Sequence, residues 1–239
     1  MIDIHSHIIF DIDDGASGIE ESVALCSQAY ENGCTAIVAT PHFNKYESVE
    51  DFLILRDIRI GEIQQELEIE KIDVKIYGGC ELYLNKKVFT AGDLDGLTIN
   101  NSRYMLCEFP LGPYDFDSSI YMLDELCSRG YEPILAHPER YYQFHDHPEI
   151  IDDILDLGCH LQVNIDSLIG NLGRSAQRMS SDLVESGYAQ FIASDAHDPR
   201  HRNLELREKF SRLPEGIDKN MVYKCVVENP EKVISNSDL

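Results

Sequence analysis

Histidine and carboxylate side chains recur directly after short apolar runs of this sequence. His5 and His7 follow the first run, and Asp195 and His197 follow the last, in both cases two residues apart. Residues two apart in an extended segment face the same side, so each pair can point at one site. Imidazole and carboxylate together suit Mn²⁺, Zn²⁺ or Fe²⁺. The side chains in this pattern are His5, His7, Asp13, Asp14, His42, Glu81, Glu108, His137, Asp195 and His197.

The apolar runs predict strands, and the amphipathic stretches between them predict helices. Glycines follow several helical stretches, where a left-handed residue ends a helix, and Ser48 is a candidate helix cap with Asp51 three residues later. The predicted strands are Met1–Ile4, Ala36–Ala39, Val74–Tyr77, Tyr104–Glu108, Pro133–Ala136, His160–Asn164 and Gln190–Ala193. The predicted helices are Ile19–Asn32, Val49–Ile69, Ser118–Ser128, Glu149–Leu157 and Ala176–Glu185, and the terminating glycines are Gly33, Gly130, Gly158 and Gly187.

This alternation predicts an α/β fold with a parallel sheet, in a single domain over residues 1–239. Seven strands favour a β/α barrel, and an open doubly wound sheet is the alternative. The sequence lacks the glycine-rich dinucleotide and phosphate-loop fingerprints that would favour the open sheet. In a parallel barrel the C-terminal strand ends meet at one mouth, so the candidate ligands would share one pocket.

Each candidate residue also has an ordinary structural explanation. Asp13-Asp14-Gly15 alone would be a turn, and His137 alone could be a hydrogen-bonded core histidine. One geometry explains all of them together, which favours a metal site. The ligands exceed one coordination sphere, so at least two ions are expected, and three fit the count. The remaining histidines lie outside the pattern and are interpreted as structural or solvated: His145, His147, His160 and His201.

Composition excludes several classes of function. The 239 residues carry a net charge of −23, and no Lys/Arg-rich stretch offers a basic face for nucleic acid. The sequence shows no signal peptide and no apolar run long enough to cross a bilayer, so a cytoplasmic protein without membrane insertion is expected. Seven cysteines occur without a Cys-x-x-Cys pair and are interpreted as buried apolar residues. None has an arginine six residues later, which argues against a cysteine-nucleophile phosphatase.

Several motifs resemble one family over essentially the whole chain. The sequence is similar to the polymerase-and-histidinol-phosphatase (PHP) superfamily of trinuclear metal phosphoesterases. It resembles most the bacterial CpsB/CapC family of manganese-dependent protein-tyrosine phosphatases. The residues that carry the resemblance are Met1–His7, Asp11–Gly15, Asn101–Tyr104, Ala136–Tyr141, Ala193–His197 and Asn229-Pro230. The resemblance implies a distorted (β/α)7 barrel of the TIM type, with its metal site at the C-terminal strand ends.

The resemblance also implies a role for each candidate. One ion would use His5, His7 and Asp195 and share Glu81 with a second ion, which adds Glu108 and His137. A third ion would use Asp14, His42 and His197. The three ions would most readily be Mn²⁺, with Fe or Zn as alternatives. Arg140 and Arg202 match phosphate-contacting arginines, although Arg200 lies close to Arg202 and competes for that role. His42 or His197 would assist departure of the leaving group.

The implied activity is removal of phosphate from the tyrosine-rich tail of a bacterial tyrosine kinase that regulates capsule or exopolysaccharide synthesis. A histidinol-phosphate phosphatase with the same metals is the main alternative. An amidohydrolase or a TatD-like nuclease is a second one. The amidohydrolases commonly bridge their metals with a modified lysine where this chain has Glu108, and a nuclease would gain from a basic groove. A metal-stabilised docking partner without turnover is the non-enzymatic alternative. The oligomeric state stays open.

Overall fold

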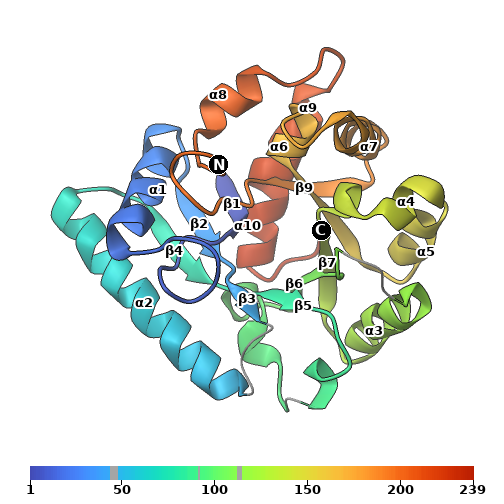
Figure 1. Ribbon diagram of the computed structural model, residues 1–239, viewed down its shortest axis with the longest axis horizontal. Coiled ribbons are helices and arrows are strands. Elements are labelled where there is room, and N and C mark those ends of the chain that lie inside the picture. Colours follow the sequence, from blue (N-terminus) through green and yellow to red (C-terminus); the bar gives the residue numbers. More distant parts are fainter. Residues whose placement is uncertain (44–47, 91, 112–114) are drawn as a thin grey trace.

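Parallel strands occupy the centre of the molecule, with helices packed around them (Figure 1). The computed structural model describes residues 1–43, 48–90, 92–111 and 115–239. Within them the strands form two sheets, with the orders β1-β2-β4 and β3-β5-β6-β7-β8-β9, and every pairing is parallel. The bounds are β1 Ile2–Ser6, β2 Ala36–Ala39, β3 His42–Phe43, β4 Lys75–Gly78, β5 Glu81–Tyr83, β6 Tyr104–Glu108, β7 Glu132–Ala136, β8 His160–Asn164 and β9 Ala189–Ala193.

This arrangement confirms the predicted α/β class and the parallel pairing. All seven predicted strands are present, and β3 and β5 are two short strands that the sequence analysis did not predict. Each lies directly beyond an earlier strand: β2 leads into β3, and β4 leads into β5. A run of two or three residues is too short to show an alternating pattern, so the pattern could not reveal them.

The two sheets meet at two places. On one side, the pairing of β2 with β4 continues into the pairing of β3 with β5: Gly79 N donates to Ala39 O at 3.0 Å, and Glu81 N donates to Pro41 O at 3.2 Å. On the other side, residues 6 and 196 form a parallel bridge, and Asp195 N donates to His5 O at 2.9 Å. Both contacts lie at the C-terminal ends of the strands, where the candidate ligands are.

The helices follow the strands as expected for βα units (Figure 1). The predicted helices are all present, and short helices after β7, β8 and β9 were not predicted. Their bounds are α1 Ile19–Glu31, α2 Val49–Glu70, α3 Phe116–Ser128, α4 Tyr142–Asp146, α5 Ile150–Asp156, α6 Ile165–Leu168, α7 Arg174–Glu185, α8 Leu206–Ser211, α9 Lys219–Tyr223 and α10 Asn229–Ile234. A π-helical turn over Lys224–Glu228 joins α9 to α10, and 3₁₀ turns cover Val88–Thr90, Asp95–Leu97, Ile99–Asn101 and Pro138–Arg140.

The helix boundaries confirm the predicted start and stop signals. Ser48 Oγ accepts a hydrogen bond from Asp51 N at 3.2 Å at the start of α2, which satisfies one free donor of the first turn. The four predicted terminating glycines have φ between 77° and 90°, the left-handed region that lacks a Cβ penalty in glycine: Gly33, Gly130, Gly158 and Gly187. None of the helices among the described residues is long and apolar enough to cross a membrane.

Strand alternation divides the core into two clusters and also aims the candidate ligands. In β6, Tyr104 and Leu106 belong to the smaller cluster, whereas Met105 and Cys107 belong to the larger one. The smaller cluster is built mainly from alternate residues of several strands, so it lies on the face that the strands share. Glu108 continues the series of Tyr104 and Leu106. Strand periodicity therefore turns its carboxylate to the same side as the shared cluster.

The cysteines confirm the structural interpretation. All seven are free thiols, and six are buried. Cys127 is half-buried, with its sulfur 3.8 Å from that of Cys159.

Candidate metal centre

His5 of β1, His7 directly after this strand and the carboxylate of Glu81 in β5 form the middle of the site. His5 Nε2 and His7 Nε2 each lie 3.2 Å from the same atom, Glu81 Oε2, and lie 3.3 Å from each other. All three side chains are buried, with exposures of 0–1%. Their convergence is possible because β1 pairs with β2 in one sheet, while Glu81 begins β5 in the other.

A second group lies beside the first, at the ends of β7 and β9. His137 Nε2 is 2.9 Å from Glu81 Oε1, and Asp195 Oδ1 is 3.4 Å from His5 Nε2. His137 and Asp195 both have positive φ, 38° and 53°. This backbone conformation is strained for residues other than glycine, and it occurs here where each chain leaves its strand. It turns both side chains back toward the centre.

The third group brings together His42, Glu81 and Glu108. His42 Nδ1 lies 3.1 Å from Glu81 Oε2 and 3.0 Å from Glu108 Oε1. The register of the sheet explains the contact, because β3 pairs with β5 and β5 pairs with β6, so His42 faces Glu81 and Tyr83 faces Glu108.

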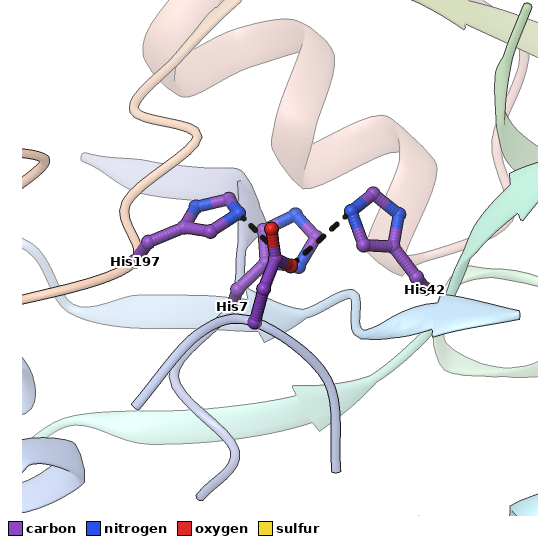
Figure 2. A group of neighbouring side chains, drawn as sticks. His7, His42 and His197 are labelled. Carbon is purple, nitrogen blue, oxygen red and sulfur yellow. Dashed lines mark ion pairs between the residues drawn. The ribbon is translucent and has the colours of Figure 1, made fainter. Parts of the chain in front are cut away.

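The fourth group opens toward solvent. Figure 2 shows the rings of His42 and His197 on either side of His7. Asp14 Oδ1 is 3.5 Å from His42 Nε2 and 3.5 Å from His197 Nε2, and the Asp14 side chain is 65% exposed. Its loop is tight: a Cβ on Gly15 would lie 2.1 Å from His7 O, so only glycine fits at that position.

The structure thus gathers every residue of the implied ligand set. Within each group, one ligand atom from every residue lies within 4.8 Å of the others. The groups are His7, Asp14, His42 and His197; His5, His7 and Glu81; His5, His137 and Asp195; and His42, Glu81 and Glu108.

Two arginines reach the edge of this cluster. Arg140 Nη1 lies 3.1 Å from Asp195 Oδ2, and Arg202 Nη2 lies 2.5 Å from Asp195 Oδ1. Both guanidinium groups are partly exposed, at 27% and 38%. Arg200, the competing residue, is exposed. The structure therefore brings Arg202 to the cluster with Arg140.

Polar residues behind the ligands hold the histidine rings in place. His7 Nδ1 lies 2.7 Å from Asp13 Oδ2, which also accepts the backbone N–H of His42 at 3.0 Å. His5 Nδ1 lies 2.8 Å from Oε1, the side-chain amide oxygen of Gln162. A carboxylate or amide oxygen behind an imidazole fixes its tautomer and orientation. Asp13 belongs to the sequence pattern of candidate residues without an assigned role, and Gln162 lies outside that pattern.

The same support extends to Asp195. Gln162 Nε2 donates to Asn164 Oδ1 at 2.9 Å, and Asn164 Nδ2 donates to Asp195 Oδ2 at 2.7 Å. Gln162 and Asn164 alternate in β8, so they lie on one face of a buried strand. The polar residues at alternate positions of β8, His160, Gln162 and Asn164, are the signal that could have identified them.

Opposite charges shift the pKa values throughout the cluster. Burial alone would lower the pKa of His5 and His7, but Glu81 and the neighbouring carboxylates outweigh it and raise both pKa values. Burial would raise the pKa of Glu81, yet His5 and the other imidazoles hold it well below its usual value. A hydrogen bond with His197 lowers the pKa of Asp14. The carboxylates are therefore ionised and ready to bind cations.

The donor set fits divalent cations. The site combines imidazole nitrogens and carboxylate oxygens, the ligands of Mn²⁺, Fe²⁺ and Zn²⁺. The buried Nδ1 of His42 has no hydrogen-bond partner among the described residues. A carboxylate oxygen of Glu108 lies 3.0 Å from it, and one of Glu81 lies 3.1 Å from it. A buried nitrogen that faces two carboxylates without a hydrogen bond suits a cation between them.

Comparison with known proteins agrees with this geometry. The chain is 30% identical over 244 residues to the tyrosine-protein phosphatase CpsB of Streptococcus agalactiae, covering 99% of each protein. Crystal structures of YwqE from Bacillus subtilis and CpsB from Streptococcus pneumoniae, described as metal-dependent tyrosine phosphatases, include a chain that superposes with a TM-score of 0.89. It shares 28% identity, and the match covers 100% of this chain and 96% of that one. The lactonase Lmo2620 of Listeria monocytogenes shares the fold, with a TM-score of 0.58, 13% identity, and coverage of 99% and 95%.

The family model for capsular polysaccharide synthesis, CpsB/CapC, matches residues 1–235. This match spans every group of the metal centre and both arginines. The chain belongs to the CpsB/CapC family of capsular polysaccharide synthesis proteins.

Proposed function

We propose that this protein is a manganese-dependent protein-tyrosine phosphatase, a phosphoric monoester hydrolase of the cytoplasm. Its substrate would be the phosphorylated tyrosine tail of a bacterial tyrosine kinase that regulates capsular or exopolysaccharide synthesis. The observation that carries the proposal is the convergence of Arg140 and Arg202 on Asp195, at the edge of the cluster of imidazoles and carboxylates. The relatives named as tyrosine phosphatases support the same activity.

The four groups support three ion sites in one centre. His5, His7 and Asp195 would hold one ion, and Glu81 would bridge it to a second held with Glu108 and His137. Asp14, His42 and His197 would hold the third. We also take residues 1–239 as one domain in which the two sheets act as a single distorted barrel. The pairing that runs without a break from Ala39 and Gly79 to Pro41 and Glu81 supports this proposal, as does the bridge between residues 6 and 196.

The chain's own residues would bind and orient the phosphate. Bound divalent ions would supply Lewis acidity, by acidifying water and neutralising phosphoryl oxygens. Arg140 and Arg202 would exchange part of their contact with Asp195 for bidentate hydrogen bonds to phosphoryl oxygens. Their partial exposure leaves both groups accessible to a substrate that enters from solvent.

His42 and His197 would serve the leaving group. The Nε2 atom of each lies 3.5 Å from Oδ1 of the exposed Asp14. A phenolate with a pKa of ~10 leaves with little help, and the positive charge of an ion held by the two imidazoles would offset the charge that forms on the departing oxygen.

The decisive experiment compares two substrates side by side. Phosphate release would be measured from a phosphotyrosine peptide and from histidinol phosphate, with Mn²⁺ and after chelation. We expect metal-dependent turnover that favours the peptide, and a loss of on the order of 10²-fold in Arg140→Met. Arg129→Met, which breaks a surface ion pair with Glu125, is the control that keeps full activity. Preference for histidinol phosphate would refute the substrate, and no turnover of either with metal bound would refute the phosphatase itself.

A further inference from the structure

A buried ion pair lies outside the metal centre, between α6 and α8. Lys209 Nζ lies 2.8 Å from Asp166 Oδ2, and the two residues are 6% and 7% exposed. Burying an ammonium and a carboxylate is costly even when they are paired, and apolar residues of similar size often serve stability as well or better. Stability of the fold alone therefore does not explain why an ion pair occupies this place.

The pair holds the segment that carries Arg202. Besides Asp166, Lys209 Nζ donates to the backbone carbonyl of Asn203 at 2.8 Å. Asn203 directly follows Arg202, whose own carbonyl accepts the backbone N–H of His197 at 2.8 Å. The Lys209 ammonium therefore binds the backbone one residue after Arg202.

The other end of the pair is fixed to the site. Asp166 lies two residues after Asn164, whose side chain donates to Asp195 Oδ2 at 2.7 Å. Its second oxygen, Oδ1, accepts a hydrogen bond from Asn171 Nδ2 at 2.7 Å, so the carboxylate cannot rotate freely. Lys209 therefore links the C-terminal end of β8, which supports Asp195, to the loop whose arginine contacts Asp195.

Other hydrogen bonds shape the loop that carries Arg202 and hold it against α1. Asp198 accepts the backbone N–H groups of Arg200 and Arg202 through its two oxygens, at 2.9 and 3.2 Å. Gln28 of α1 donates to Pro199 O at 2.8 Å and accepts from Leu204 N at 3.3 Å. These bonds shape the loop and tie it to α1. Among the described residues, the bond from Lys209 is the one that ties it to the β8 side.

We infer that Lys209 and Asp166 are positioning residues for Arg202. Their ion pair fixes the position of the loop that carries Arg202, so that the guanidinium reaches the phosphoryl group of the substrate. This inference rests on the proposed function, because it gives Arg202 a phosphate to bind. Neither residue touches the candidate metal ligands, so their removal would change phosphate binding without changing metal binding.

The test uses inorganic phosphate as the probe and the Mn²⁺-loaded full chain. The double variant Lys209→Met/Asp166→Leu replaces the pair by apolar groups, which avoids an unpaired buried charge. We expect its affinity for phosphate to fall on the order of tenfold, while its Mn²⁺ affinity and thermal midpoint stay close to those of the parent. Titration calorimetry measures both affinities. Lys209→Arg, which keeps a cation within reach of Asp166 and Asn203, should recover most of the loss.

A double-mutant cycle separates positioning from general disturbance. In an Arg202→Met background the same double change should cost nothing further, because the group that it positions is absent. An equal loss in both backgrounds would overturn the inference, as would unchanged phosphate affinity in either Lys209→Met/Asp166→Leu or Arg202→Met alone. Arg129→Met on α3 is the surface control. Turnover of phosphotyrosine is not needed for this cycle, so failure of the proposed substrate and failure of the positioning role give different results.

Discussion

At the scale of single residues, the side chains behind His5 and His7 distinguish these two candidate ligands from the histidines outside the cluster. His5 and His7 direct one nitrogen at the cluster and are held from behind by Gln162 and Asp13. The histidines outside the cluster have ordinary partners instead. His145 donates to Glu139 O, His160 pairs with Glu132, His147 pairs with Glu149 at the surface, and His201 is exposed. Their interpretation as structural or solvated residues is confirmed.

Asp13 gives a test at this scale. Asp13→Asn keeps the shape of the side chain but removes the charge that orients His7 and contacts the backbone of His42. We expect Mn²⁺ affinity to fall by about 10–100-fold, the usual effect of losing a carboxylate behind a metal-binding histidine. Titration calorimetry checks the value.

Asp11→Asn is the matched control for this change. Asp11 is exposed and has φ of 57°, which asparagine also tolerates, so its metal affinity should match that of the parent. Equal affinities in all three proteins would show that Asp13 does not support the site.

At the scale of elements, hydrophobic periodicity predicted the longer strands and helices, and the elements too short to show a period were missed. The seven strands, the long helices, the Ser48 cap and the terminating glycines each carry a signal of several residues or a defined backbone conformation. The strands β3 and β5 and the short helices α4, α6, α8 and α9 are too brief for a hydrophobic period. Their places are set by tertiary contacts, such as the sheet register that brings His42 to Glu81.

The candidate site shows the same division. The His-x-His and Asp-x-His spacings predicted that the two residues of each pair lie on the same side of an extended segment. The position of the pairs at strand ends predicted that they meet at one edge of the fold. The supporting network through Gln162 and Asn164 joins β8 to residues far away in the sequence, and no local pattern encodes such a contact. The positive φ values of His137 and Asp195 are likewise a product of the surrounding structure.

At the opposite strand ends, a smaller polar cluster gives an element-scale test. Glu132 of β7 bonds Arg103 at 2.5 Å and His160 at 2.9 Å. Burial raises the pKa of Glu132, but these two partners outweigh it, so its pKa lies below the usual 4.5. A carboxyl with a lowered pKa in the folded state stabilises the fold above about pH 4.5 and loses that contribution as pH falls through its folded pKa.

We therefore expect Glu132→Gln to lower the thermal midpoint of the metal-free protein at pH 7. The difference from the parent should shrink as the pH falls from about 5 to 3, where the parent also loses the charge. Calorimetry at several pH values measures both. Glu185→Gln, at an exposed residue in the last turn of α7, is the control that should change neither. A difference that is constant with pH would contradict the role of the Glu132 charge.

At the scale of the whole molecule, the metal centre connects distant parts of the chain. The nine candidate ligands come from β1, β3, β5, β6 and from the segments after β1, β7 and β9, so bound cations would join both sheets. The chain carries a net charge of −23, and its carboxylates repel one another in the compact state. Cations at Asp14, Glu81, Glu108 and Asp195 would offset part of that repulsion.

Metal should therefore stabilise the entire fold. A ligand at 100 times its Kd adds about 2.7 kcal/mol to the free energy of unfolding. For a chain of this size each kcal/mol shifts the midpoint by roughly 2–4 °C. We expect Mn²⁺ to raise the midpoint of chelator-treated protein by about 5–10 °C in differential scanning calorimetry, and Mg²⁺, which prefers an oxygen shell, to raise it less. A midpoint that does not respond to Mn²⁺ would argue against the metal centre.

The spread of the ligands along the sequence also matters while the chain is being made. Among the candidate ligands, His5 and His7 leave the ribosome before the others, and their partners Asp195 and His197 follow 190 residues later. At about 5–20 residues per second, the first imidazoles wait roughly ten to forty seconds for the last ligands. During that time the two proposed ion sites that include Asp195 or His197 lack a ligand. These two sites can therefore fill only once β9 and the segment after it have been made, so the assembled strand ends rather than the early histidines alone select their metal.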